Sequence, residues 1–576
     1  MTGTSSAPGT AAAPDAPEVP ALPVPCSLAE ALAAAAREQG DRATLIYNGQ
    51  PLTLTQLERE ARRCASRFAR LGIVRGDVVA LWMPSTPAWL AAFFGLARLC
   101  AIALAANTRF RGMELSDIFA RAGVKAVVWW PGYRGIDFPE LLAEAQPQLP
   151  QLRHVITYGG QTGKAPAALT ETAWAELATE LEYADDHGAA TLPCILFTTS
   201  GTTRKPKLVM HSQYALVRHG REVGVAMGFA KPGAAALNAL PLAGTFGFTH
   251  AMACLMSGTR MVLADAFEPA EAARLMAAHG VNVSAMTYEM IVRIFAATDV
   301  PVPFPGLDLF TGSHADHMVG LAAERGFRMI GVYGSSEVHA LFSRRDAGDD
   351  PVRRALGGGR PVCAATRVRA TDLDSGAVLP CDQPGQLEIS GPTVTLGYYH
   401  DADATARAFT SDGWFRTGDL GSVGADGSVL YLARLGDSLR LRGFLVSPFE
   451  IEAFIAEQPG VELAQVVGAD GPDGLPCAVC FYKVKPGARV DGAVLRAACA
   501  AGMASYKVPL RCIEVDSFPV GNSPNAVKID RIELRRRAAA LFAHAAAQPA
   551  QGAPLAAPDT PDLNVTAAST AASGNQ

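Results

Sequence analysis

The sequence has few charged residues for its length and no excess of positive charge. Of its 576 residues, 18% are Asp, Glu, Lys or Arg, and 50 Lys and Arg stand against 55 Asp and Glu, a net charge of −5 at pH 7. Nucleic acids and anionic membranes attract proteins through clustered positive charge, so neither is expected as the main partner. Apolar residues make up 49% of the chain, which is enough for a substantial buried core.

The sequence also lacks the marks of a secreted or membrane-spanning protein. Its 11 cysteines are too sparse for a dense disulfide framework. The first basic residue is Arg37, so a signal peptide would lack its charged start. The most apolar stretch, Leu90–Ala106, contains Arg98 and is shorter than the roughly 20 residues that span a bilayer. We therefore expect a soluble, cytoplasmic protein with no membrane span.

Two low-complexity ends flank a long alternating region. Residues 1–24 and 548–576 are mostly small or polar and rich in Ala and Pro. Such ends bury too little apolar surface to offset the entropy of ordering, so both are predicted to be disordered. Between them, short apolar strands alternate with helices, as over 235–333. This alternation predicts an α/β fold with parallel sheets that are covered on both faces.

The pattern changes in the last third of the chain. After about residue 360, short strands separated by Gly-containing turns predict antiparallel pairing. From Ser447 onward, helices and strands predict a compact α+β unit. We expect an N-terminal domain over 25–436 and a C-terminal domain over 437–547.

Local signals place individual elements. Ser27 with Glu30, and Thr55 with Glu58, have the spacing of a capping box, in which each side chain bonds the other residue's backbone N–H at a helix start. Cys477 and Cys480 form a Cys-x-x-Cys pair inside a predicted strand. Residues three apart in a strand face opposite sides, so we expect core cysteines rather than a metal or redox pair.

A loop rich in hydroxyls and cationic groups follows one of the buried strands. Residues 198–207 read Thr-Thr-Ser-Gly-Thr-Thr-Arg-Lys-Pro-Lys. Hydroxyls, a glycine amide and lysines on one loop offer many donors with little steric bulk, which suits a polyphosphate. The loop differs from the usual P-loop pattern, which requires Gly-x4-Gly-Lys-Ser/Thr.

Two further segments carry carboxylates in constrained settings. Tyr333-Gly-Ser-Ser-Glu337 follows a strand and places hydroxyls beside a carboxylate, a combination that can bind Mg²⁺ together with phosphate oxygens. In 413–421, Gly-Trp-Phe-Arg-Thr-Gly-Asp-Leu-Gly, the carboxylate of Asp419 lies between glycines and can accept both hydroxyls of a ribose. Two more segments, 434–443 and 525–531, follow at wide spacing.

In this order and spacing, the five segments resemble the adenylate-forming superfamily of acyl-CoA synthetases, carrier-protein adenylation domains and luciferases. The resemblance covers about residues 25–545. It implies an α/β fold: a large N-terminal domain of two αβ layers plus a β-barrel, and a small, mobile α+β C-terminal domain.

The resemblance also implies roles for the residues that match the superfamily's motifs. Lys528, Lys207 and Glu337 would be catalytic, with Lys528 reaching the carboxylate and α-phosphate and Glu337 holding Mg²⁺. ATP or AMP would contact Thr199, Ser200, Gly201, Thr202, Thr203, Tyr333, Gly334, Ser336, Asp419 and Arg434. The acyl group would contact Gly244, Phe246 and Gly312, the domains would turn about Asp437, and Gly443 would lie toward the thiol donor.

These roles predict an ATP-dependent carboxylate–CoA ligase that uses Mg²⁺ and works through an acyl-adenylate. The acyl-pocket regions 241–250 and 307–315 contain no Arg or Lys for a second carboxylate. We therefore expect an aromatic or short-to-medium-chain monocarboxylic acid. Two alternatives remain open: a freestanding adenylation enzyme that loads an acyl-carrier protein, and a non-catalytic nucleotide-binding relative.

Overall fold

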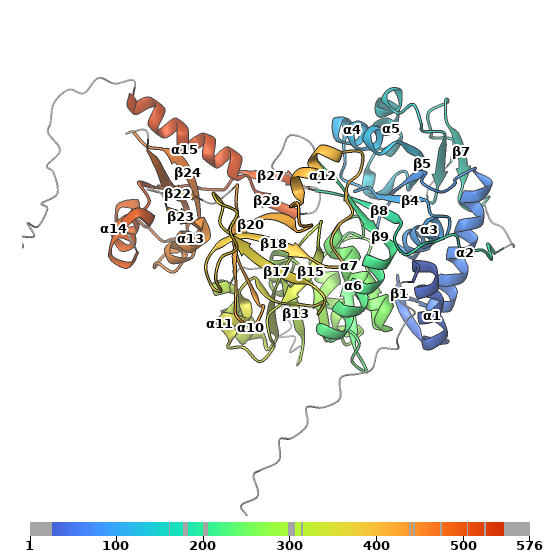
Figure 1. The fold of residues 1–576 in the computed structure, drawn as a ribbon, viewed down its shortest axis with the longest axis horizontal. Helices are drawn as coiled ribbons and strands as arrows, with labels where there is room; N and C mark the ends of the chain where they lie inside the picture. The colour runs from blue at the N-terminus through green and yellow to red at the C-terminus, as the bar shows by residue number, and fades with distance from the viewer. Residues whose placement is uncertain are drawn as a thin grey trace, which may run out of the picture.

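Strands and helices alternate along most of the chain. A computed structural model describes residues 26–159, 162–176, 182–199, 206–297, 306–312, 315–436, 439–441, 444–472, 475–503, 505–523 and 526–546. The ends predicted to be disordered, 1–24 and 548–576, lie outside these residues. In Figure 1 the C-terminal elements lie at one end of the molecule, the first 200 residues at the other, and the antiparallel strands β17–β20 between them.

An eight-stranded sheet forms the core of the first part. Its order is β19 (Gly397–Tyr398), β9 (Leu208–Ser212), β8 (Pro193–Thr198), β4 (Ile102–Ala105), β3 (Val78–Trp82), β5 (Val124–Trp129), β6 (His154–Thr157) and β7 (Thr170–Ala173). The strands from β8 to β7 pair in parallel, whereas β9 pairs antiparallel with both of its neighbours. Strand β3 is buried at every position, as expected for a parallel strand covered on both faces.

A nine-stranded sheet joins a parallel part to an antiparallel part. Its order is β12 (Val283–Ala285), β13 (Asp308–Thr311), β14 (Arg328–Ser335), β15 (His339–Arg344), β16 (Gly358–Pro361), β21 (Val429–Arg434), β20 (Phe415–Val423), β18 (Gly385–Ser390) and β17 (Arg367–Thr371). The change of direction occurs between β14 and β15. A four-stranded sheet completes this region: β10 (Ala235–Asn238), β11 (Arg260–Leu263), β1 (Ala43–Tyr47) and β2 (Gln50–Thr53).

Helices cover these sheets. They are α1 (Leu28–Gln39), α2 (Leu54–Arg70), α3 (Pro87–Arg98), α4 (Gly112–Ala122), α5 (Phe138–Ala145), α6 (Gln213–Ala226), α7 (Thr245–Ser257), α8 (Pro269–Ala278), α9 (Tyr288–Ala296), α10 (Ala315–Arg325), α11 (Pro351–Ala355) and α12 (Ala402–Ala408). Helix α3 is apolar on all sides and buried from its second residue onward. Helices α6 and α7 approach closely because Gly220 has no side chain: a Cβ there would lie 3.2 Å from the Met252 backbone.

The C-terminal region packs helices on both faces of a three-stranded sheet. The sheet consists of β24 (Val461–Asp470), β25 (Pro476–Val484) and β26 (Arg511–Glu514). The other elements are β22 (Leu439–Leu441), β23 (Phe444–Val446), α13 (Pro448–Ala456), α14 (Gly492–Gly502), β27 (Val520–Ser523), β28 (Ala526–Ile529) and α15 (Arg531–Ala546). Cys480 is buried in the core under α13 and α14, and Cys477 packs against the core under α15. The two cysteines therefore face opposite sides of the sheet, as predicted.

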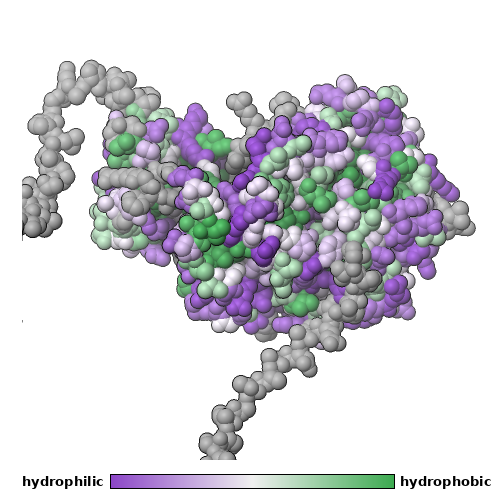
Figure 2. Space-filling view, viewed as in Figure 1, coloured by the Kyte–Doolittle hydropathy of each residue, from purple (hydrophilic) through white to green (hydrophobic). Residues whose placement is uncertain are grey.

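The observed elements confirm the predicted α/β class, with a large N-terminal domain and a smaller C-terminal one. Ser27 and Glu30 form the predicted capping box of α1. The capping box predicted at Thr55 and Glu58 is wrong. Thr53 and Gln56 form the box instead, because β2 ends at Thr53 and α2 begins at the next residue. Figure 2 shows polar residues over most of the visible face, with apolar residues in small groups. Within the described ranges, no helix combines the length and hydropathy needed to cross a bilayer.

Candidate active site

The two ends of the predicted phosphate loop are joined. The Thr199 backbone N–H donates to the Lys207 carbonyl at 3.0 Å, and the Lys207 backbone N–H donates to Thr199 Oγ1 at 3.1 Å. This pairing continues the antiparallel ladder of β8 and β9. The loop between them, with Ser200, Gly201, Thr202 and Thr203, lies outside the described residues. The structure therefore fixes where the loop starts and returns.

Tyr398 links a cation from this loop to the carboxylate of Glu337. The Lys207 Nζ lies 4.3 Å from the centre of the Tyr398 ring, which is within the range of a cation–π contact. The Tyr398 hydroxyl donates to Glu337 Oε1 at 3.1 Å. Burial, and then the nearby carboxylate of Glu337, raise the pKa of Tyr398, so its hydroxyl stays protonated. Among the described residues, neither Lys207 nor Glu337 has an ion-pair partner.

Asp419 is a buried carboxylate between two polar partners. Its side chain is 2% exposed, and Oδ2 accepts a hydrogen bond of 2.6 Å from the Tyr333 hydroxyl. Arg434 is opposite Asp419 in the β20–β21 register, and its Nε lies 3.0 Å from Oδ1. Burial raises the pKa of Asp419, while the Arg434 charge and the Tyr333 hydrogen bond act in the opposite direction.

One oxygen of this carboxylate is left with capacity to accept. Despite its ion-pair distance from Arg434, Asp419 Oδ1 has no hydrogen-bond donor among the residues that the structure describes. A carboxylate oxygen has more than one lone pair, so Oδ1 can accept a ligand hydroxyl beside its contact with Arg434. The geometry therefore fits a ribose.

The turn that follows β14 is held from two other elements. The His211 Nε2–H donates to the Ser336 carbonyl at 2.7 Å, and the Thr245 hydroxyl donates to Ser336 Oγ at 3.2 Å. Gly334 has to be a glycine here, because a Cβ would lie 2.5 Å from the His339 carbonyl. The β14–β15 turn is thus fixed next to Glu337.

The predicted acyl-contact residues are only partly brought together. Gly244 is the N-cap of α7, so it directly precedes Thr245 and lies near Ser336. Phe246 is partly buried against two hydrophobic cores. Gly312 directly follows β13, is exposed, and has no atom within 4 Å of the position of an added Cβ.

Three predicted residues of the C-terminal part cannot be placed in the site. Asp437 and Gly443 lie outside the described residues. Lys528 lies in β28, where its backbone pairs with Gly521 of β27, and its side chain is not among those described. Their roles stay predictions.

Sequence reasoning missed three side chains that organise the site: Tyr398, His211 and Thr245. Tyr398 belongs to a two-residue strand that pairs with β9 from almost 190 positions away. His211 is fully buried, and a histidine in an apolar strand gives no signal of its partner. The only available sign for Thr245 was its place after Gly244 at a helix start.

The types of residue at this site suit Mg²⁺ and ATP. Glu337 supplies one carboxylate, and no group of three or more His, Cys, Asp or Glu in the described part of the chain could hold a metal by itself. Mg²⁺ commonly takes one or two protein carboxylates and completes its shell with water and phosphate oxygens. A metal here would therefore depend on the nucleotide.

The fold and these polar groups define a two-domain α/β enzyme with a candidate nucleotide site. The chain belongs to the AMP-binding enzyme family: the family's model matches residues 32–399, and the model of the AMP-binding enzyme C-terminal domain matches residues 450–523. This confirms the predicted adenylate-forming superfamily and the class of AMP-forming acid–thiol ligases.

Relatives of known name cover most of the chain. It is 30% identical over 535 residues to the 2-hydroxy-7-methoxy-5-methyl-1-naphthoate–CoA ligase of Streptomyces carzinostaticus. The aligned region covers 89% of this chain and 93% of the relative. It is 27% identical over 528 residues to the putative acyl-CoA synthetase YngI of Bacillus subtilis (strain 168), covering 87% and 95%. The fold matches the crystal structure of the anthranilate CoA ligase AuaEII in complex with anthranoyl-AMP, with a TM-score of 0.77, 23% identity, and coverage of 91% and 99%.

Proposed function

We propose that the protein is an ATP-dependent carboxylate–CoA ligase that works through an acyl-adenylate. The observation that carries most weight is the buried Asp419 carboxylate, since Tyr333 and Arg434 hold its two oxygens in place. A ribose offers two adjacent hydroxyls as donors. Family membership supplies the reaction class, and this geometry supports the nucleotide as its substrate.

In this proposal the nucleotide lies across the groups described above. Asp419 and Arg434 hold the ribose, and Tyr333 borders the adenine. Lys207 and the loop from Thr199 hold the phosphates, with Ser200, Gly201, Thr202 and Thr203 as loop donors. Gly334 and Ser336 line the same turn. Glu337 is the residue that would hold Mg²⁺, which would neutralise phosphate charge when bound.

The reaction brings anions together, so charge neutralisation is its main demand. In the first half-reaction, a carboxylate oxygen bonds to the α-phosphorus of ATP and the bond to pyrophosphate breaks. In the second, a thiol sulfur bonds to the acyl carbon and AMP leaves. Lys528 would place a positive charge where the carboxylate meets the α-phosphate, and preorganised charges of this kind are among the largest contributions to catalysis.

We also propose that the two domains move between the half-reactions. The boundary lies between residues 436 and 437, Asp437 acts as the hinge, and Gly443 turns toward the thiol donor. One active site cannot suit both steps at once, so exchange of the faces of the C-terminal domain would serve both.

The acid is proposed to be an aromatic or short-to-medium-chain monocarboxylate that contacts Gly244, Phe246 and Gly312. The regions 241–250 and 307–315 hold no Arg or Lys that could pair with a second carboxylate. Two proteins similar to this chain are named for aromatic acids, a naphthoate and anthranilate, which favours the aromatic class.

The decisive experiment measures the products of the reaction. Purified protein with Mg-ATP and a library of monocarboxylic acids should release pyrophosphate with at least one acid, and addition of CoA should yield AMP and a thioester. Formation of ADP and orthophosphate instead would refute the adenylation mechanism. Pyrophosphate release with transfer to an acyl-carrier protein but not to CoA would favour the carrier-loading alternative. ATP binding without any pyrophosphate release would favour the non-catalytic one.

A further inference from the structure

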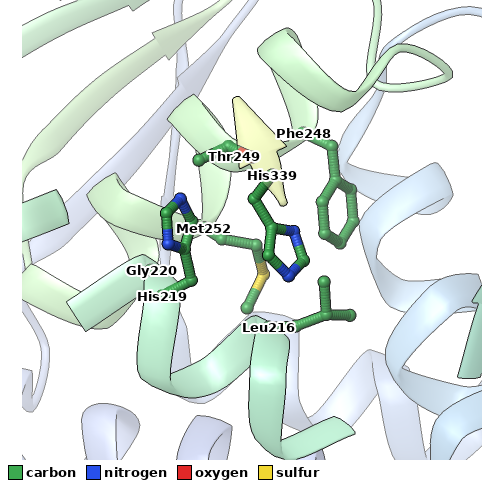
Figure 3. A pocket seen from close by; sticks show the side chains of 7 residues that line it. All are labelled: Leu216, His219, Gly220, Phe248, Thr249, Met252 and His339. Carbon is green, nitrogen blue, oxygen red and sulfur yellow. The ribbon is translucent and has the colours of Figure 1, made fainter. Parts of the chain in front are cut away.

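Three buried histidines from three different elements form one stack of rings. His211 comes from β9, His219 from α6 and His339 from β15, and each is at most 2% exposed. The ring centroids of His211 and His339 lie 3.9 Å apart, and those of His219 and His339 lie 4.8 Å apart, with interplanar angles of 30° and 20°. In Figure 3 the His339 ring lies between Phe248 on one side and His219 on the other. His339 is therefore the middle ring of the stack.

The two outer rings each donate a hydrogen bond to a backbone carbonyl of the same turn. His211 Nε2 lies 2.7 Å from the Ser336 carbonyl, and His219 Nε2 lies 2.9 Å from the Ala340 carbonyl. A carbonyl can only accept, so both nitrogens carry a proton. Burial lowers the pKa of both rings to about 4, so each donates as a neutral group near pH 7. The stack thus holds the turn at two points, one before and one after Glu337.

The backbone near the second of these points has an unfavourable conformation. The φ angles of His339 and Leu341 are +65° and +61°, in the left-handed region that residues other than glycine rarely adopt. Each such residue costs about 1–3 kcal/mol and persists where the surrounding structure fixes it. The shape of this segment therefore depends on support from outside, and the hydrogen bond to the Ala340 carbonyl supplies part of it.

Glu337 lies inside the segment that the stack holds. Its carbonyl accepts a hydrogen bond of 2.7 Å from the Thr395 N–H, and its Oε1 accepts one of 3.1 Å from the Tyr398 hydroxyl. Because Glu337 directly follows Ser336, a shift of the Ser336 carbonyl moves the backbone from which the Glu337 side chain starts. A functional group has to be held within about 0.5 Å of its productive position. The hydrogen bond from His211 therefore bears on where the carboxylate lies.

The stack has polar atoms that packing alone does not require. His211 Nδ1, His219 Nδ1 and His339 Nε2 have no partner among the described residues, and each such atom costs about 1–3 kcal/mol. The described residues around His219 and His339 pack so closely that no water molecule fits between them. Apolar side chains would avoid this cost, but they could not donate to the carbonyls of the turn. The rings therefore contribute something that tight packing does not.

We propose that His211, His219 and His339 form a positioning unit for the residue that would hold Mg²⁺. The outer rings fix two carbonyls of the turn, the middle ring sets the spacing between them, and Glu337 is thereby oriented before Mg-ATP binds. The inference rests on the proposed ligase function and adds residues that act through Glu337. Without either donor, Mg-ATP itself would have to order the turn, and part of its binding energy would be lost.

The test separates the hydrogen bond from the ring. His211→Phe and His219→Phe keep an aromatic ring and remove the donor, whereas Gln at either position keeps a neutral N–H donor. Calorimetric titration with ATP, in Mg²⁺ and in EDTA and without any acid, gives the factor by which Mg²⁺ tightens ATP binding. Loss of a partner that orients a metal ligand typically weakens metal binding by 10–100-fold. We expect the Phe variants to lose about tenfold or more of this factor and the Gln variants to retain most of it. The affinity for ATP in EDTA should stay unchanged.

Hydrogen exchange of the backbone amides over 333–345, measured without ligand, gives a readout that needs no activity. Exchange should be severalfold faster in both Phe variants than in wild type. Tyr482→Phe is the matched control, because the buried Tyr482 hydroxyl donates to the Val490 carbonyl at 2.8 Å in the C-terminal domain. This control also removes a ring-borne donor from a backbone carbonyl, and it should change neither the Mg²⁺ factor nor exchange in the turn.

Two results would overturn the positioning role and leave the ligase intact. One is a Mg²⁺ factor and an exchange rate in both Phe variants equal to those of wild type. The other is a loss in the Gln variants as large as in the Phe variants, since the donor would then not be the group that matters. If a Phe variant does not fold, His211→Leu or His219→Leu takes its place with the same expectation. Absence of ATP binding by wild type would refute the proposed function, and the inference with it.

Discussion

The Tyr333 hydroxyl lies 2.6 Å from Asp419 Oδ2, so a hydrogen bond joins two residues that are 86 positions apart in the sequence. Tyr333 comes from β14, and Asp419 from β20, four strands further along the same sheet. The bond orients the buried carboxylate so that its other oxygen, Oδ1, lies 3.0 Å from Arg434 Nε. The Tyr333 hydroxyl thus helps to fix the Asp419 oxygen that would accept a ribose hydroxyl.

Tyr333→Phe should weaken nucleotide binding with little effect on the chemical step. Removing the donor leaves Asp419 Oδ2 without its hydrogen bond, and a hydrogen bond to a charged group is worth about 1.5–3 kcal/mol. We expect the KM for ATP to rise about tenfold or more, with a smaller change in kcat. Tyr158→Phe, outside this site at the end of β6, is the control. An unchanged KM for ATP would argue against the assignment of Asp419 to the ribose.

Tyr398 can be dissected because its ring and its hydroxyl contact different residues. Tyr398→Phe keeps the ring under Lys207 and removes the hydrogen bond to Glu337. Loss of a partner that orients a metal ligand typically weakens metal binding by 10–100-fold. We expect Tyr398→Phe to raise the Mg²⁺ concentration needed for half-maximal rate, and Tyr398→Leu to raise the KM for ATP as well. Identical behaviour of both variants would contradict separate roles.

Lys528→Ala should separate the two half-reactions. Loss of one preorganised charge typically lowers the rate by about 10²–10³, so acyl-adenylate formation should nearly disappear. Conversion of a chemically supplied acyl-adenylate to the thioester should persist, because the second step is proposed to use another face of the domain. A change of less than about twofold in both steps is the result expected of an ordinary surface residue, and it would refute the role of Lys528.

Stability should fall between pH 6.5 and pH 4 because several histidines are buried in the neutral form. Burial lowers the pKa of His211 and His219 to about 4, below the value of about 6.5 in an unfolded chain. The unfolded state therefore binds more protons in this window. The stabilisation is complete above pH 6.5 and is lost as the pH falls toward 4. The free energy of unfolding, measured with denaturant, should depend less on pH in His219→Gln than in wild type. Between pH 7.5 and pH 5 we expect it to fall by about 2 kcal/mol less in the variant. An equal sensitivity in both proteins would contradict a neutral His219.

The elements that could be predicted are those with strong local signals. The alternation of strands and helices predicted over 235–333 is observed, because apolar periodicity and short turns determine these elements locally. The start of α2 was missed because Thr53–Gln56 and Thr55–Glu58 both have capping-box spacing. Which of them is used depends on where the preceding hairpin ends, and that is set by pairing with β1.

The residues of the candidate site also fall into two groups, those with a local sequence signal and those without one. Asp419, Tyr333 and Glu337 lie in short motifs directly after or within strands, and the motif alone singled them out. Tyr398 and His211 could not be found, because their importance arises from contacts with residues far away in the sequence. A two-residue strand and a buried histidine leave no periodic pattern that would mark them.

The resting arrangement of Lys207 and Glu337 has a consequence for the rate of nucleotide capture. The two opposite charges flank one phenol ring but are not paired with each other in the described structure. A triphosphate that arrives with its metal therefore meets a cation and an anion that are already separated, and no salt bridge has to open first. Binding should accordingly require little reorganisation, and its association rate should respond to ionic strength more than to temperature.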